Sequence, residues 1–275
     1  MIETDVFICP KCGKDLWAEG KSYYCENNHC YDVSRHGYVN LLLSNQKNSL
    51  IPGDNAEMIS ARVKVMNADY YKSLADAIIY LMRNENKECI VDAGCGVGYI
   101  SKRLKDEFSD TIVVGTDISK SAIEQASKKF KGAIYAVASS KRLPVKSNCA
   151  DAIVCAFAPI YGDEFLRVSK DNGFLFHVVP GRNHLRKLKE FLYGEVFFRE
   201  NEMEPIGIKG YDFLDKILIK DTFCGDKEII KSLIKMTPYY YHTSKEKLEK
   251  LEEIDEFETN LEFELRVYKK GYERY

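Results

Sequence analysis

Residues 89–99 read CIVDAGCGVGY, and this stretch decides the fold class. A short apolar run, typical of a buried strand, passes directly into a loop that contains Gly94, Gly96 and Gly98. Glycines at the carboxyl end of a strand allow the backbone to approach a ligand closely, and the next helix starts there. The acidic residue Asp92 closes the strand just before the loop. The stretch therefore predicts a cofactor site at the end of the first strand of an α/β sheet.

The flanking sequence alternates between β-rich and helical runs. Further strands are expected at 111–115, 133–137, 150–155, 173–179, 217–223 and 261–268, and helices at 56–67, 74–83, 119–130 and 185–193. Such alternation with short connections predicts a mostly parallel sheet with helices on both faces. In 261–268 charged and apolar residues alternate, so we expect one face of that strand to meet solvent.

The spacing G-x-G-x-G differs from the G-x-G-x-x-G of dinucleotide sites, which makes a nicotinamide-binding domain the less favoured alternative. The next strand ends in Asp117, whose carboxylate is placed to accept both ribose hydroxyls. The pattern resembles the signature of class I methyltransferases, which use S-adenosylmethionine. That resemblance implies cofactor contacts from Asp92, Gly94, Gly96, Val97, Gly98 and Asp117.

The N-terminal segment carries paired metal-ligand residues. Cys9 and Cys12 form a CxxC knuckle, and Cys25 is followed by His29 and Cys30, either of which can complete a set of four. Zinc prefers a tetrahedron of thiolates and imidazoles, and each tight turn presents two ligands to the same ion. Four protein ligands leave no open position, so the zinc is expected to be structural.

Composition narrows the class of protein. The chain has 275 residues, of which 45% are hydrophobic and 30% charged, as in a globular protein. No apolar run is long enough for a bilayer and no leader peptide is evident, so we expect a cytoplasmic protein that makes no membrane contact. The nine cysteines are an odd number, which argues against a complete disulfide framework. The net charge of −2 means that any RNA binding must come from local basic patches.

Taken together, these motifs resemble one family along most of the chain, the RlmA family of 23S rRNA (guanine-N1-)-methyltransferases, whose relatives include the tylosin-resistance methyltransferase. The matching stretches are CPKC with C-x3-H-x-YD (9–32), GYVNLL (37–42), GDNAEM (53–58) with Arg62, ASSKRLP (138–144), AP (158–159), PGRNHL (180–185) and MTP (236–238).

The resemblance implies several assignments. His29 becomes the fourth zinc ligand, and Tyr71 and His184 become cofactor contacts, although Tyr70 adjoins Tyr71 and a histidine near a helix start is often a capping or surface residue. The implied reaction is methylation of N1 of a guanine in a hairpin loop of 23S rRNA, and the implied assembly is a homodimer.

Some residues stay open between two interpretations. Phe157 and Tyr161 follow the fourth strand and either stack on a flipped base or belong to the core. No carboxylate–histidine pair identifies a general base, so the catalytic residues are unassigned. Basic residues either contact RNA or form solvated faces; they are Lys11, Lys14, Arg35, Lys47, Arg182, Arg186, Lys187 and Lys189.

The expected organisation is a zinc-binding module (1–43), a linker with a helical segment (44–88) and a methyltransferase domain (89–275). Two other functions compete with rRNA methylation. One is a small-molecule methyltransferase of the same fold, which would not need a zinc knuckle. The other is a zinc-dependent RNA-binding protein with an inactive methyltransferase domain, against which the intact glycine loop and Asp117 argue.

Overall fold

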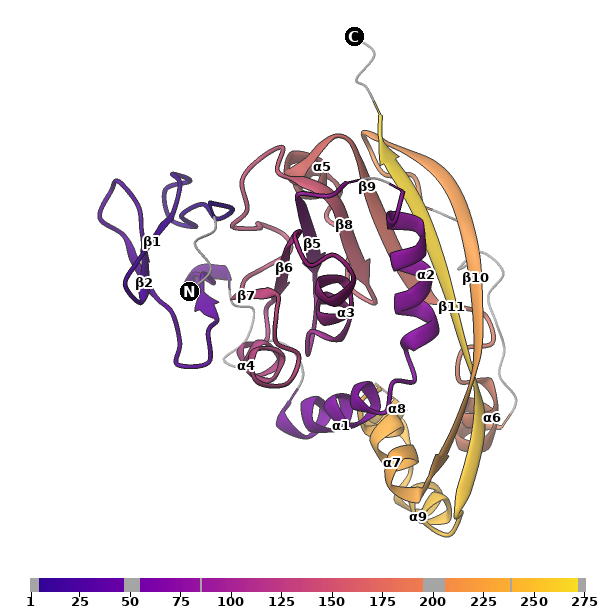
Figure 1. The fold of residues 1–275 in the computed structure, drawn as a ribbon. Helices are drawn as coiled ribbons and strands as arrows, with labels where there is room; N and C mark the ends of the chain where they lie inside the picture. Colours follow the sequence, from indigo (N-terminus) through magenta and orange to yellow (C-terminus); the bar gives the residue numbers. More distant parts are fainter. Residues whose placement is uncertain (1–4, 47–54, 85, 195–205, 238, 272–275) are drawn as a thin grey trace.

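The computed structural model describes residues 5–46, 55–84, 86–194, 206–237 and 239–271. Its centre is an eight-stranded sheet with strand order β10-β11-β9-β8-β5-β6-β7-β4 (Figure 1). The strands are β4 (Val39–Asn40), β5 (Cys89–Ala93), β6 (Ile112–Asp117), β7 (Ile134–Val137), β8 (Ala150–Ala156), β9 (Ser169–Pro180), β10 (Tyr211–Asp226) and β11 (Glu256–Lys270). The pairs from β4 through β9 are parallel, whereas β11 pairs antiparallel with both β9 and β10. The predicted mostly parallel sheet is therefore confirmed.

Helices cover both faces of this sheet. They are α1 (Ala56–Asn67), α2 (Lys72–Met82), α3 (Tyr99–Glu107), α4 (Lys120–Lys129), α5 (Gly162–Val168), α6 (Arg186–Tyr193), α7 (Lys227–Lys235), α8 (Tyr239–His242) and α9 (Lys245–Glu252). Buried residues of α1, α2, α6 and α7 share one core with one sheet face, whereas α5 shares the core of the opposite face with the N-terminal segment. No helix among the described residues is long and apolar enough to cross a membrane.

Local sequence explains where two of these helices begin. The side chain of Asn55 accepts a hydrogen bond from the Met58 backbone N–H at 2.9 Å, which caps α1. Ser119 caps α4 in the same way through the Ala122 N–H. Both caps satisfy backbone donors that a helix N-terminus leaves without partners inside the helix.

The N-terminal segment forms its own three-stranded antiparallel sheet of β1 (Trp17–Glu19), β2 (Ser22–Tyr24) and β3 (Cys30–Asp32). It lies beside the main sheet in Figure 1, coloured indigo. Phe7 is fully buried and pairs with Val145, and the Ile8 N–H donates to the Pro144 carbonyl at 3.0 Å. β4 then joins the edge of the main sheet beside β7, and a short 3-10 helix, η1 (Ser44–Gln46), follows.

The expectation that one face of the last strand meets solvent is wrong. In β11 the charged residues Glu262, Glu264 and Arg266 are 4%, 2% and 3% exposed. Arg266 Nε lies 2.6 Å from Glu264 Oε1, and Glu262 accepts hydrogen bonds from Asn183. A buried charge is tolerated when it is paired and hydrogen-bonded. The alternation of charged and apolar residues along β11 therefore distinguishes the two faces of the strand, and both faces are covered by other parts of the protein.

Candidate functional site: a glycine loop and a cysteine–histidine cluster

The loop after β5 has a backbone that requires glycine. Gly94, Gly96 and Gly98 have φ of +84°, +54° and +86°, in the left-handed region that residues with a Cβ rarely adopt. The backbone N–H groups of Gly94 and Cys95 both donate to the Thr116 carbonyl, at 2.8 and 2.9 Å. These two bonds fix the loop to the end of β6, and Val97, which lies inside it, is buried.

Close packing beneath the loop also excludes side chains. A Cβ on Gly94 would lie 2.6 Å from the Ala158 Cβ, and one on Gly98 would lie 2.6 Å from the Tyr135 hydroxyl. Ala158 belongs to the segment after β8, so the first glycine brings the ends of β5 and β8 together. The loop is therefore a backbone cradle that a Cβ would fill, and this is the feature expected of a cofactor site.

Two acidic residues flank the cradle with different roles. Asp117 ends β6 and accepts hydrogen bonds from the backbone N–H groups of Gly96 (3.0 Å) and Ser119 (2.8 Å), which orient its carboxylate beside the loop. Asp92 is buried below the loop and accepts from the Ser101 hydroxyl at 2.6 Å. Burial raises the pKa of Asp92 to about 7. Asp92 thus braces the start of α3, whereas the Asp117 carboxylate lies beside the glycine loop.

Tyr71 and His184, far apart in the sequence, meet around one ring. The Tyr71 and His184 rings lie 5.1 and 5.0 Å from the ring of Phe263 on β11. Both side chains are buried, and burial raises the pKa of Tyr71 to about 12 and lowers that of His184 to about 3. His184 is therefore neutral, and its Nδ1 accepts from the Glu262 backbone N–H at 3.3 Å. Tyr70 instead packs against Phe223 and donates to the Cys224 carbonyl at 2.6 Å.

Phe157 is the exposed member of this aromatic group. Its ring lies 6.1 Å from Tyr71 and 5.8 Å from Phe263, yet 45% of the residue is exposed. Its φ of +57° is a left-handed conformation that costs a non-glycine residue about 1–3 kcal/mol and often marks a functional site. Tyr161, by contrast, is half-buried against the core at the start of α5. The structure thus separates two aromatics that the sequence left equivalent.

The N-terminal cluster has the geometry of a tetrahedral metal site. The Sγ atoms of Cys9, Cys12 and Cys25 and the Nδ1 atom of His29 all lie within 4.8 Å of one another. Cys12 and Cys25 Sγ are 3.7 Å apart, and His29 Nδ1 is 3.4 Å from both Cys9 and Cys25 Sγ. Ligand atoms around a tetrahedral zinc lie roughly 3.5–3.8 Å apart, given zinc–ligand bonds of about 2.0–2.3 Å. Cys30 is exposed and lies outside this cluster.

Comparisons with known proteins agree with both sites. The family model described as RlmA, N-terminal, a zinc ribbon, matches residues 7–50, and a general methyltransferase-domain model matches 90–171. A Bacillus subtilis protein, YxjB, described as a candidate 23S rRNA (guanine-N(1)-)-methyltransferase, is 29% identical over 97% of this chain and 98% of its own length. A similarly described Micromonospora griseorubida protein is 31% identical over 67% of this chain and 68% of its own length.

The chain belongs to the RlmA family. The 23S rRNA (guanine(748)-N(1))-methyltransferase of Streptomyces fradiae is a further relative, 27% identical over 87% of both chains. A solved structure concerned with the conversion of a disulfide bond into a thioacetal group in echinomycin biosynthesis has a TM-score of 0.50 at 13% identity, over 73% of this chain and 82% of that one. That likeness concerns the fold alone. S-adenosylmethionine and a structural zinc ion are the cofactors of the chain, as the methyltransferase-domain match, the zinc-ribbon match and the cysteine–histidine cluster together indicate.

One residue near the cradle was not singled out for a role by sequence reasoning. Arg62 of α1 extends over the glycine loop, with Nη1 3.5 Å from the position that a Cβ on Gly96 would take. Its Nη2 donates to the Met236 carbonyl at 3.4 Å. Arg62 and Met236 both belong to stretches that resemble the family. This shared resemblance was the sequence signal that pointed to Arg62.

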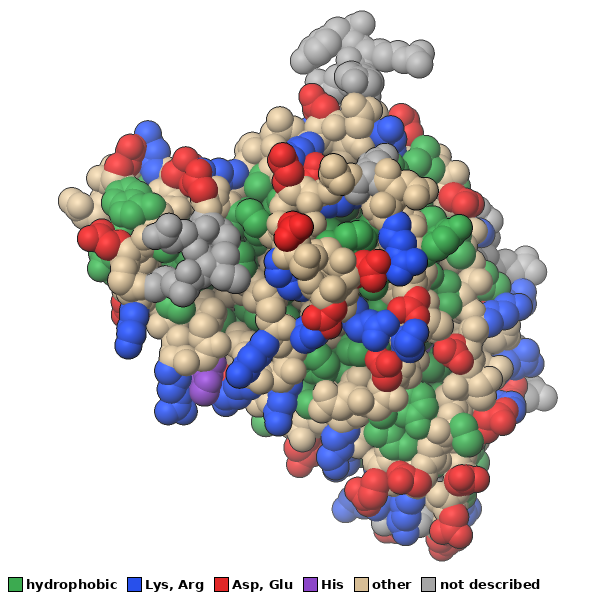
Figure 2. Space-filling view, viewed as in Figure 1, with side chains coloured by type: hydrophobic (Ala, Val, Ile, Leu, Met, Phe, Trp, Pro, Cys, Tyr) green, Lys and Arg blue, Asp and Glu red, His purple; other side chains and the backbone are tan. Residues whose placement is uncertain are grey.

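Most of the basic residues that were left open between RNA contact and a solvated face make contacts within the protein. Lys14 pairs with Glu26 at 2.7 Å, Arg186 with Glu190 at 2.8 Å and Lys187 with Glu258 at 2.5 Å. Lys189 lies over the Tyr239 ring, 5.6 Å from its centre. Figure 2 shows Lys and Arg interspersed with Asp and Glu over much of one face. Lys47 lies outside the described residues.

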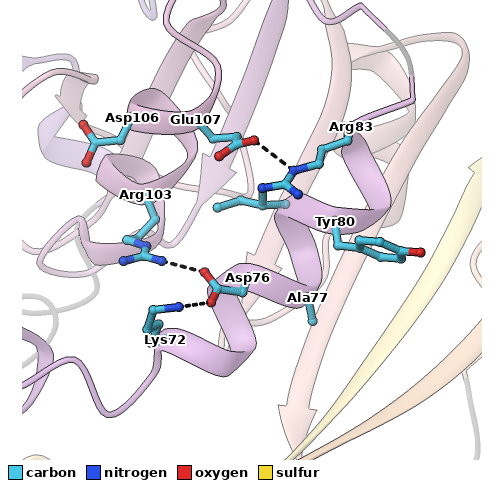
Figure 3. Close-up of a pocket in the computed structure, with 9 residues that line it drawn as sticks. Lys72, Asp76, Ala77, Tyr80, Arg83, Arg103, Asp106 and Glu107 are labelled. Carbon is cyan, nitrogen blue, oxygen red and sulfur yellow. Dashed lines mark hydrogen bonds and ion pairs between the residues drawn. The ribbon is translucent and has the colours of Figure 1, made fainter.

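A polar groove between α2 and α3, of roughly 660 Å³, does not coincide with the cofactor cradle (Figure 3). Its cations and anions pair with each other: Arg103 Nη2 lies 2.5 Å from Asp76, Arg83 Nε lies 2.9 Å from Glu107, and Lys72 also pairs with Asp76. Because the charges that line the groove neutralise one another, it offers no unbalanced charge for a ligand.

Proposed function

We propose that this chain methylates N1 of a guanine in a hairpin loop of 23S rRNA, with S-adenosylmethionine as methyl donor. The names of the relatives support the reaction and the substrate. The observation that carries the proposal in the structure is Phe157, an exposed aromatic in a left-handed conformation beside the glycine loop. A base swung out of its stack needs such a surface.

The chain's own residues account for binding and orientation of the donor. Gly94, Gly96, Val97 and Gly98 would border the methionine and ribose portion, and the Asp117 carboxylate would accept hydrogen bonds from the ribose hydroxyls. When bound, S-adenosylmethionine supplies a methyl group on a positively charged, electrophilic sulfur. Tyr71 and His184 close the cradle from the side of β11. The neutral state of His184 matters here, because an imidazolium would repel the cationic sulfur.

We assign Phe157 to the side of the site that receives the guanine base. Stacking on an aromatic side chain fixes the plane of a base, and alanine substitution at such contacts costs about 1–3 kcal/mol per base. Guanine N1 carries a proton that must be released when N1 accepts the methyl group. Holding the two groups in line supplies much of the rate. None of the described residues is assigned as the base that takes the proton.

The zinc ligands in this proposal are Cys9, Cys12, Cys25 and His29. With four protein ligands the ion has no open position, so its role is to stabilise the fold of a segment too small to hold a core of its own. The hydroxyl of Tyr31 lies 3.2 Å from Cys9 Sγ and supplies an outer hydrogen bond to that ligand. This module, with Lys11 and Arg35, is the part of the chain that we assign to RNA positioning.

The organisation of the chain follows from the same proposal. We assign 1–43 to the zinc module, 44–88 to a linker with helices, and 89–275 to the methyltransferase domain. A cytoplasmic location fits both the rRNA substrate and a thiolate zinc site, which a reducing compartment preserves. A homodimer is also proposed. Its support is that, among the described residues, β10 forms one edge of the sheet and exposes Phe213, Leu214 and Leu218, and an apolar edge strand favours pairing with another copy.

The experiment is to incubate the purified chain with tritiated S-adenosylmethionine and 23S rRNA from a strain that lacks the endogenous enzyme. Primer extension then maps the product, because a methyl group on N1 blocks base pairing and halts the polymerase. A single stop at a hairpin-loop guanine is expected. Phe157→Leu should lower kcat/KM for rRNA roughly 10- to 100-fold while cofactor affinity stays within threefold.

The rival functions give different results in the same assay. Incorporation into a small molecule and none into rRNA would identify a small-molecule methyltransferase. Binding of rRNA and cofactor without incorporation would identify an inactive methyltransferase domain. Either result would refute the proposed reaction.

A further inference from the structure

The side chain of Arg62 is held in a fixed place above the cofactor loop. α1 packs against α7, and the Arg62 guanidinium donates through Nη2 to the carbonyl of Met236, which caps the C-terminus of α7. Carbonyl groups at a helix C-terminus carry partial negative charge and hold a cation well. This contact orients the planar guanidinium, so its second nitrogen has a defined position.

That second nitrogen, Nη1, faces the loop. It lies 3.5 Å from where a Cβ on Gly96 would be, and the Cδ of the same side chain lies 4.0 Å from that point. The half-buried Arg62 therefore occupies the space above the second glycine of the cradle. The backbone N–H of Gly96 in turn donates to Asp117, the residue assigned to the ribose. If Asp117 holds the ribose, Arg62 would lie on the side of the loop toward the methionine portion.

Only one group of the cofactor carries the negative charge that would pair with a cation at this position. S-adenosylmethionine carries a sulfonium and an ammonium group, both positive, and a single anionic group, the α-carboxylate. A guanidinium matches a carboxylate with two parallel hydrogen bonds. On these grounds we propose that Arg62 binds the α-carboxylate of S-adenosylmethionine, and of S-adenosylhomocysteine after transfer. The inference rests on the cofactor of the proposed function and not on its RNA substrate.

The test compares two ligands that differ only in the carboxylate. Affinities for S-adenosylmethionine and for decarboxylated S-adenosylmethionine are measured by calorimetry on the full chain and on Arg62→Met. The substitution should weaken S-adenosylmethionine roughly 10- to 100-fold, as expected for a hydrogen-bonded charge pair, and should change the affinity for the decarboxylated ligand less than threefold. Arg62→Lys should recover part of the loss, because it restores the charge without the planar fork.

Lys64→Met is the matched control, since Lys64 is an exposed residue of the same helix. It should leave both affinities within threefold of the original chain. Equal weakening of both ligands by Arg62→Met would overturn the inference, because Arg62 would then act on the shape of the loop. No weakening of either ligand would overturn it too. No RNA enters these measurements, so a failure of rRNA methylation alone would leave them interpretable.

Discussion

Replacing Gly94 by alanine tests the closeness of the loop to the end of β8. The new Cβ would lie 2.6 Å from the Ala158 Cβ, whereas ordinary contact begins at 3.4 Å, so one side must move by about 0.8 Å. A misplacement near 1 Å can cost an enzyme about 100-fold in rate. The left-handed φ of +84° adds backbone strain of roughly 1–2 kcal/mol. We therefore expect kcat/KM for methyl transfer to fall about 100-fold.

Gly20→Ala separates these two effects. Gly20 also has a left-handed φ, +58°, but its Cβ would meet nothing within 4 Å. It should share the strain and keep methyl transfer and S-adenosylmethionine affinity close to those of the original chain. Both variants are assayed by tritium incorporation and calorimetry, with circular dichroism melts as a check on folding. If Gly94→Ala stays within threefold of the original chain in both assays, the inferred contact between the two strand ends is not part of the site.

Three further predictions concern the zinc site, a buried histidine and a buried ion pair. Cys12→Ser should lower the zinc content measured by mass spectrometry well below one ion per chain, and Cys30→Ser should leave it at one. The opposite pattern would show that Cys30, and not Cys12, is a zinc ligand. His184 has a pKa of about 3 when folded against an ordinary value of 6.5, so the unfolded chain binds more protons between these values. The free energy of unfolding, measured by urea titration, should accordingly fall between pH 6.5 and pH 4. The fall should be steeper in the original chain than in His184→Gln. Parallel curves for the two proteins would contradict a buried, neutral His184. Arg266→Met should lower the free energy of unfolding by about 3–5 kcal/mol, because it leaves Glu264 buried without its partner. The double variant Arg266→Met/Glu264→Gln should lose less than the sum of the two single variants. Additive losses would show that Arg266 and Glu264 do not interact.

The sequence predictions for the glycine loop and the metal-ligand cluster rest on local spacing. The three glycines follow directly after a strand, and Asp117 ends the next one, so their neighbourhood is fixed by two adjacent parallel strands. The prediction of the metal-ligand cluster also rests on local sequence, because two tight turns within thirty residues can bring their ligands together in few ways. Between His29 and Cys30 spacing alone gave no decision, and the family resemblance favoured His29. The structure agrees, with His29 inside the cluster and Cys30 exposed.

The sequence by itself thus determined the α/β class, and it predicted the cofactor loop and the metal-ligand set, since each depends on short stretches in which residue type restricts the backbone. Only the tertiary structure decided that Tyr71 and His184 meet at Phe263 and that Arg62 reaches over Gly96. It also decided that the charged face of β11 is buried. Those contacts join segments far apart in the chain, and an alternating pattern states that two faces differ without stating what covers them.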